Sequence, residues 1–178
     1  MSPILLQTDQ EEFTMKTLHV LRHARSEPAG PGVADRERGL DEQGEEDARR
    51  MGAALAERIL PQPLVVSPAR RAQLTLAGLC EGWPALAPMP HRTEDKLYSL
   101  TTGELVAWLQ QQPDSETSLF LLGHNPTLSE LVNHLASDAV AVTLPTTGYV
   151  QLQLPIEHWQ ELDRGCGERV LQLGPATV

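Results

Sequence analysis

Arginine and histidine side chains follow three separate apolar runs of this sequence. Arg22 and His23 come directly after the run 18–21, Arg71 comes shortly after the run 64–66, and His124 follows the run 118–122. Such runs are typical of buried strands, and ligands of open α/β sheets bind beyond the carboxyl ends of the strands. An imidazole is a nucleophile near neutral pH, and a guanidinium group binds oxyanions through paired hydrogen bonds. These residues therefore indicate an anion site beside a histidine nucleophile.

The three segments resemble the motifs of the histidine phosphatase superfamily, which has the phosphoglycerate mutase-like fold. That family combines an Arg-His-Gly tripeptide, a Ser-Pro-x-x-Arg-Ala-x-x-Thr segment and a late Gly-His. This chain has, in the same order, Arg22-His23-Ala24, Ser67 to Thr75, and Gly123-His124. The resemblance runs from about Met15 to the C-terminus. Ala24 in place of glycine, the short chain and the sequence Gly-His-Asn-Pro are most similar to the SixA-type phosphohistidine phosphatases.

The resemblance implies a hydrolase in which His23 attacks phosphorus and becomes covalently phosphorylated. It places the phosphate oxygens against Arg22, Arg71 and a protonated His124, and it implies neither a metal nor a cofactor. Arg25 is either a cation at the rim of the substrate site or a solvated charge, and both interpretations stay open. Arg70 lies about 100° from Arg71 on a helix, so we expect it on the surface. The remaining histidines are assigned to packing or to the surface: His19, His91, His134 and His158.

The helices and strands expected around these residues predict an α/β protein with three layers, α/β/α, around a mostly parallel sheet. A helix is expected over 41–60, with Asp41 as its N-cap and an apolar stripe on one side. Further helices are expected to begin at Pro68, Thr101 and Pro126. Strands are expected at 18–21, 64–66 and 118–122, with a short extended piece at 87–89 and late strands within 140–144, 149–154 and 169–173. Residues 15–178 are predicted to form one domain, and residues 1–14 a flexible N-terminal extension.

Composition limits the partners of this 178-residue chain. Its net charge of −10 argues against nucleic-acid binding, so a phosphate site must be a local basic pocket. Its two cysteines, Cys80 and Cys166, form no disulfide framework and favour a cytoplasmic location. Neither a Cys-x-x-Cys nor a His-Glu-x-x-His spacing supports a metal site. No apolar run approaches the roughly 20 residues of a membrane span.

One departure from the family bears on the substrate. Ester-hydrolysing relatives carry a carboxylic acid that protonates the leaving group, but the matching segment here is Leu97-Tyr98-Ser99. Glu104 and Glu94 are the nearby candidates for that acid. Such an acid typically contributes about 10²–10⁴-fold, and a phosphohistidine loses less without it because its imidazole can leave as a neutral ring.

The favoured hypothesis is therefore a phosphohistidine phosphatase that acts on a phosphorylated protein, such as a histidine phosphotransfer domain. The first alternative is a broad small-molecule phosphomonoesterase, or a phosphoglycerate mutase, of the same superfamily. An alternative of another class is an inactive phosphate-binding module. A substrate panel separates the first two, and trapping a phosphoenzyme on His23 excludes the third.

Overall fold

A computed structural model describes residues 14–178 of the chain. In these residues a six-stranded sheet runs in the order β3-β2-β4-β1-β5-β6. The strands are β1 (Lys16–Arg22), β2 (Val65–Val66), β3 (Arg92–Thr93), β4 (Ser118–Gly123), β5 (Tyr149–Leu154) and β6 (Glu168–Leu173). The predicted extension lies outside the described residues, apart from Thr14.

The sheet is mostly parallel, which confirms the predicted α/β class. Strands β1, β2, β3 and β4 pair in parallel, and only β5 runs against its neighbours β1 and β6. The register pairs Arg22 at the end of β1 with Gly123 at the end of β4. The residues that follow these two strands therefore emerge side by side at one edge of the sheet.

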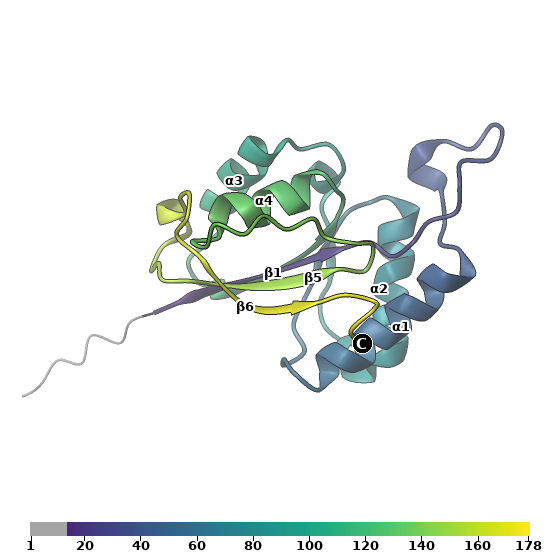
Figure 1. Cartoon of the computed structure of the whole chain (residues 1–178), viewed down its shortest axis with the longest axis horizontal. Helices are drawn as coiled ribbons and strands as arrows, with labels where there is room; N and C mark the ends of the chain where they lie inside the picture. The colour runs from purple at the N-terminus through teal and green to yellow at the C-terminus, as the bar shows by residue number, and fades with distance from the viewer. Residues whose placement is uncertain (1–13) are drawn as a thin grey trace, which may run out of the picture.

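Helices cover both faces of the sheet (Figure 1). Helices α1 (Glu42–Ala56) and α2 (Arg70–Gly82) lie on one face, and α3 (Thr102–Gln110) and α4 (Thr127–Leu135) lie on the other. Each pair buries its own apolar cluster against the strands, with Met51, Leu55 and Leu79 on the first face and Leu109, Leu131 and Leu135 on the second. The three-layer arrangement is thus held by two cores that share one sheet.

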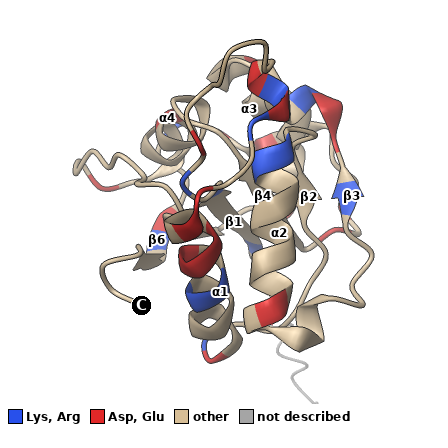
Figure 2. Cartoon of the chain, turned by 90° about the vertical axis from the view of Figure 1, so that its right-hand side faces the viewer, with Lys and Arg blue, Asp and Glu red and all other residues tan. Residues whose placement is uncertain are grey.

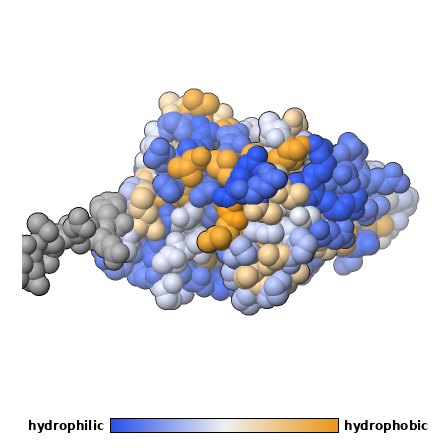
Figure 3. Space-filling view, turned by 90° about the horizontal axis from the view of Figure 1, so that it is seen from below, coloured by the Kyte–Doolittle hydropathy of each residue, from blue (hydrophilic) through white to orange (hydrophobic). Residues whose placement is uncertain are grey.

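Side-chain details explain where the helices begin and how closely they pack. Asp41 caps α1 as predicted, since its carboxylate accepts a hydrogen bond from the Gly44 amide at 2.8 Å. Helices α1 and α2 touch at Gly82, where an added Cβ would lie 1.9 Å from the carbonyl oxygen of Arg49. Seen from below, the outer face of this layer shows apolar residues interspersed with hydrophilic ones (Figure 3).

Three expected elements differ in the structure. Helix α1 ends at Ala56 rather than at residue 60, and the next residues form a turn. The extended piece expected at 87–89 is wrong, because a 3-10 helix, η2 (Pro84–Leu86), precedes a turn there and β3 forms later. The strand expected at 140–144 is also wrong. Side chains of α4 bond its backbone instead: Asn133 binds both the N–H and the carbonyl of Val142.

Candidate active site

His23 stands just beyond β1, almost completely buried at 7% exposure. Its Nδ1–H donates to the carbonyl oxygen of Ala24 at 2.7 Å, so the lone pair of the ring is at Nε2. Burial, together with the nearby charges of Arg71, Arg22 and Arg38, lowers the pKa of His23 to about 4 despite this hydrogen bond. The ring is therefore neutral at physiological pH, which is the form that can act as a nucleophile.

Guanidinium groups from three elements surround this imidazole. Arg22, at the end of β1, donates through Nη1 to the carbonyl oxygen of Leu144 at 3.1 Å. Arg71, in the first turn of α2, is only 7% exposed and donates through Nη1 to the carbonyl oxygen of Asp35 at 2.8 Å. Arg38 follows the 3-10 helix η1 (Asp35–Glu37) and is close enough to lower the pKa of His23. The Nε atom of each of these arginines is buried and has no partner in the described residues.

His124 follows β4, and its ring centroid is 5.1 Å from that of His23. Its Nε2 lies 2.7 Å from the hydroxyl of Ser67, while its Nδ1 is buried and unpartnered in the described part of the chain. Burial, then the neighbouring His23 and Arg71, lower the pKa of His124 to about 3. The ring is therefore neutral in the site without phosphate, while the protonated His124 expected from the sequence concerns the phosphate-bound site and stays a prediction. Ser67 is placed to donate to Nε2 and keep the proton on Nδ1.

Two threonines fix the backbone around His23. Thr75 in α2 donates through its hydroxyl to the carbonyl of Arg71 at 2.7 Å and accepts from the Ala24 amide at 2.9 Å. Thr147 has a φ of 59°, which is rare for a β-branched residue, and its amide donates to the His23 carbonyl at 3.1 Å. Together they tie the segment after β1 to α2 and to the turn before β5.

Asp35 and Tyr98 complete the mouth of the site. Oδ2 of Asp35 accepts from Nη2 of Arg71 at 3.1 Å and from the Tyr98 hydroxyl at 2.7 Å. Tyr98 ends the 3-10 helix η3 (Asp95–Tyr98), and its ring meets that of His124 edge-on at 5.6 Å. Sequence reasoning missed Asp35, Arg38 and Ser67 as site residues. Of these three, only Ser67 was indicated by the sequence, because it is the first residue of the motif that contains Arg71.

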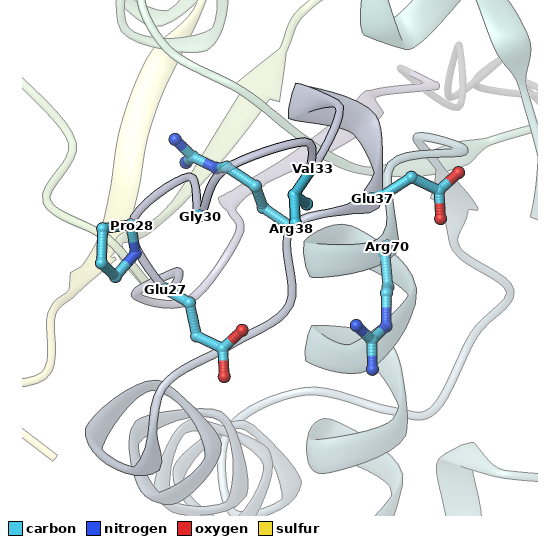
Figure 4. Close-up of a pocket in the computed structure, with 7 residues that line it drawn as sticks. All are labelled: Glu27, Pro28, Gly30, Val33, Glu37, Arg38 and Arg70. Atoms are coloured by element: carbon cyan, nitrogen blue, oxygen red, sulfur yellow. The ribbon is translucent and has the colours of Figure 1, made fainter.

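Two of the predicted basic residues lie apart from this cluster. Nε of Arg25 binds Oδ2 of Asp41 at 2.6 Å, and the Arg25 side chain is 57% exposed at the start of α1. Arg70 is exposed, as expected, and lines a cavity of about 440 Å³ between residues 27–38 and α2. Figure 4 shows the guanidinium groups of Arg70 and Arg38 pointing in different directions. The structure therefore brings together His23, Arg22, Arg71 and His124 of the predicted residues, but not Arg25.

Glu104 and Glu94, the two candidates for an acid that protonates the leaving group, serve as helix caps. Glu104 forms a capping box with Thr101 at the start of α3. Glu94 accepts from the Lys96 amide at 3.1 Å and caps η3. Neither carboxylate contacts a described residue of the His23 cluster.

Basic and acidic residues gather on different helices near the carboxyl ends of the strands. The view onto the carboxyl ends of the strands shows basic residues at the start of α2 and acidic ones along the first turns of α1 (Figure 2). Within residues 14–178, no group of three or more His, Cys, Asp or Glu side chains is arranged to hold a metal ion. No helix in this part of the chain is long and apolar enough to cross a membrane.

Comparisons with known proteins show the family to which this chain belongs. Uncharacterized protein Rv1276c of Mycobacterium tuberculosis H37Rv is 31% identical over 161 residues, which cover 84% of this chain and 96% of that protein. A SixA structure from Nakamurella multipartitia matches with a TM-score of 0.76 at 23% identity, over 90% of this chain and 96% of that one. Protein histidine phosphatase SixA complexed with tungstate gives a TM-score of 0.73 at 21% identity, over 90% and 97%. The model of the histidine phosphatase superfamily (branch 1) matches residues 18–121, more than half of the chain. The chain therefore belongs to the histidine phosphatase superfamily.

Proposed function

We propose that the protein is a phosphohistidine phosphatase, which moves a phosphoryl group from a phosphorylated histidine onto Nε2 of His23 and then to water. One observation supports this most strongly. The buried side-chain N and O atoms that lack a partner, within the described residues, belong to Arg22, Arg38, Arg71, His124 and Thr147. A buried unpaired polar group costs about 1–3 kcal/mol. The N–H groups of Arg22, Arg71 and His124 among them are donors that a ligand with several negatively charged oxygens would satisfy, and a phosphoryl group has such oxygens.

The proposed first step is attack of His23 on phosphorus. The phosphorus–leaving-group bond breaks as the Nε2–P bond forms, and Nδ1–H keeps its hydrogen bond to the Ala24 carbonyl. Charge is spread over the three equatorial oxygens in this loose transition state. The Nε–H groups of Arg22 and Arg71 and the Nδ1–H of His124 are the donors that we assign to those oxygens. Fixed hydrogen-bond donors of this kind, two of them cationic, supply transition-state stabilisation without a metal ion.

The second step returns the site to its starting state. Water attacks the phosphoryl group, and the electron pair of the N–P bond returns to Nε2 of His23. Because the pKa of His23 is about 4 in the free site, the departing imidazole is stable as a neutral ring at physiological pH. The same property that makes the ring a nucleophile therefore makes it a leaving group.

The choice of phosphohistidine over a phosphate ester rests on the proton that an alkoxide leaving group requires. Glu94 and Glu104 serve as helix caps, and Ser99 is no acid at physiological pH. An imidazole whose other ring nitrogen is protonated leaves as a neutral molecule and needs no such donor. We further propose that this imidazole belongs to a protein, such as a histidine phosphotransfer domain. The short segment between α2 and β4 supports this, because it offers little chain for a lid over a small substrate.

The test compares a histidine phosphotransfer domain phosphorylated on histidine with p-nitrophenyl phosphate as substrates. The wild-type protein is expected to dephosphorylate the domain with the higher kcat/KM and to yield an acid-labile phosphoenzyme. His23→Ala is expected to lose both the hydrolysis and the phosphoenzyme. A higher kcat/KM on small esters than on the phosphorylated domain would favour a phosphomonoesterase. Phosphate binding without turnover would identify an inactive binding module.

A further inference from the structure

A negatively charged side chain stands at the mouth of a site built for anions. Asp35 holds its Oδ2 against Nη2 of Arg71 at 3.1 Å and the Tyr98 hydroxyl at 2.7 Å. Its Oδ1 is 3.7 Å from Nε of Arg38, and the side chain is 55% exposed. A carboxylate here repels an incoming phosphoryl dianion. Its presence therefore indicates that the substrate also carries a group that a carboxylate attracts.

The surroundings of Asp35 keep it ionised and leave it free to bind one more donor. The hydrogen bond from Tyr98, followed by Arg71 and Arg38, holds the pKa of this carboxyl below its usual range. His124 lies within electrostatic reach of Asp35 and is neutral in the free site. A carboxylate has about four lone-pair positions, and both hydrogen bonds to the Asp35 side chain end on Oδ2. Oδ1, whose neighbour Arg38 is 3.7 Å away, can therefore accept a hydrogen bond from a substrate.

Leaving groups differ in how they respond to such an anion. The oxygen of a phosphate ester gains negative charge as it departs, and Asp35 would oppose this. Asp35 is also a poor proton donor, because its lowered pKa keeps it deprotonated at neutral pH. A phosphorylated imidazole, in contrast, has a lone pair on the ring nitrogen that does not bear phosphorus, and protonation of that nitrogen gives it an N–H and makes the ring cationic.

We propose that Asp35 accepts a hydrogen bond from the unphosphorylated ring nitrogen of the substrate's phosphohistidine and so selects the protonated form of that ring, which leaves as neutral imidazole. This inference rests on the proposed function. Asp35 is the specificity-determining residue of the site, and Tyr98 and Arg71 are the residues that position it.

The proposed step balances in atoms and charge. The substrate ring enters with phosphorus on one nitrogen and a proton on the other. His23 Nε2 forms a bond to phosphorus, the substrate N–P bond breaks, and its electron pair stays on the substrate ring. That ring leaves as neutral imidazole, with its original proton still directed at Asp35. The positive charge passes to the phosphorylated His23, whose Nδ1–H points at the Ala24 carbonyl.

The test is Asp35→Asn, which keeps the size and hydrogen-bonding oxygen of the side chain but removes its charge. Kinetics are measured on phosphohistidine and on p-nitrophenyl phosphate, whose leaving group needs no proton. The ratio of the two kcat/KM values is expected to shift away from phosphohistidine by about 10- to 100-fold, the loss of one charged hydrogen bond. Asp95→Asn is the matched control, because Asp95 pairs with Arg36 at the same mouth at 3.5 Å. This control also removes one negative charge, and it is expected to leave the ratio of the two kcat/KM values unchanged.

A pH profile separates a contact with the leaving group from a merely structural role. Asp35 stabilises the protonated substrate ring. In Asp35→Asn that ring is expected to lose its proton at a lower pH, so the rate of single-turnover transfer to His23 is expected to fall at a lower pH than in the wild type. An unchanged ratio and pH profile in Asp35→Asn, with wild-type activity on phosphohistidine intact, would overturn this inference alone. Wild-type protein that fails to hydrolyse phosphohistidine would overturn the proposed function and this inference together.

Discussion

The hydroxyl of Ser67 is predicted to determine which nitrogen of His124 carries the proton. Ser67 is completely buried, and its oxygen lies 2.7 Å from Nε2 of His124 and 3.3 Å from the Ala69 amide. Because the oxygen accepts from that amide, its own proton is free to point at Nε2. The proton of the neutral ring then remains on Nδ1, the atom that lacks a partner and that we assign to the phosphoryl oxygens.

Ser67→Ala removes this constraint without adding volume. Losing the hydrogen bond is expected to cost the Nδ1–H form about 1–2 kcal/mol, which corresponds to about a 5- to 30-fold loss of transition-state stabilisation. The loss is expected in kcat as well as in kcat/KM, because His124 donates most strongly as charge builds up on the oxygens. Steady-state kinetics with p-nitrophenyl phosphate measure both parameters.

The matched control lies at the start of β4, the strand that His124 follows. Ser118 opens β4, and its hydroxyl donates to Gln62 at 2.7 Å, so Ser118→Ala removes a hydrogen bond of equal length far from His124. Its kinetics are expected to stay close to wild type. Nitrogen NMR of the phosphate-bound protein reports the proton of His124 directly. A proton on Nε2 in the wild type, or equal kcat values for Ser67→Ala and Ser118→Ala, would refute the reasoning.

Three further predictions address the cations, the core and the helix packing. Arg71→Lys is expected to lower kcat by about 10²–10³-fold because an ammonium cannot replace the guanidinium fork, whereas Arg70→Lys, its exposed neighbour, should retain activity on p-nitrophenyl phosphate. Burial lowers the pKa of His19 to about 4, so this residue stabilises the fold above pH 6.5 and loses about 1.4 kcal/mol per pH unit below it. Urea unfolding between about pH 7 and 4.5 should show a shallower pH dependence in His19→Gln. Gly82→Ala, whose Cβ would lie 1.9 Å from a carbonyl of α1, should lower the unfolding free energy by about 1–3 kcal/mol. Gly103→Ala, which meets nothing within 4 Å, should raise it by up to about 1 kcal/mol, and the same unfolding assay compares the two.

The sequence predicted the residues whose position follows from a strand end. His23 and His124 stand after β1 and β4, and the parallel pairing of those strands brings the two rings to 5.1 Å. Arg71 was assigned through its motif and lies where the first turn of α2 faces the site. A largely apolar strand fixes the direction of the chain just before each of the two histidines, so local pattern and tertiary position agree.

The residues that the sequence did not reveal come from segments without periodicity. Asp35 and Arg38 lie between β1 and α1, where glycines and prolines interrupt any pattern, and only the tertiary fold brings them to Arg71 and His23. Tyr98 was passed over because the motif register drew attention to Ser99. The 3-10 turn of η3 places the phenol, rather than the following residue, against Asp35.

The wrongly predicted strand at 140–144 shows why alternation alone is insufficient. Val140, Val142 and Leu144 alternate as strand residues do, but a strand also needs a partner for its backbone. Here the partner is α4: Asn133 binds both backbone groups of Val142, and the Ser129 hydroxyl accepts from the Leu144 amide. The segment therefore runs across the helix, and its Leu144 carbonyl is left for Arg22.

The contact between Arg22 and the Leu144 carbonyl is one of two that hold the arginines of the candidate site in place. Arg22 and Arg71 are each held through Nη1 by a backbone carbonyl, at 3.1 Å and 2.8 Å, while each Nε has no partner among residues 14–178. Their charges, added to burial, are what lower the pKa of His23 and His124, so the site avoids collecting five positive charges in a small volume. An arriving phosphoryl group then finds its donors already oriented, and little reorganisation is needed in the transition state. The arginines that these carbonyls fix thus also help burial to keep His23 neutral.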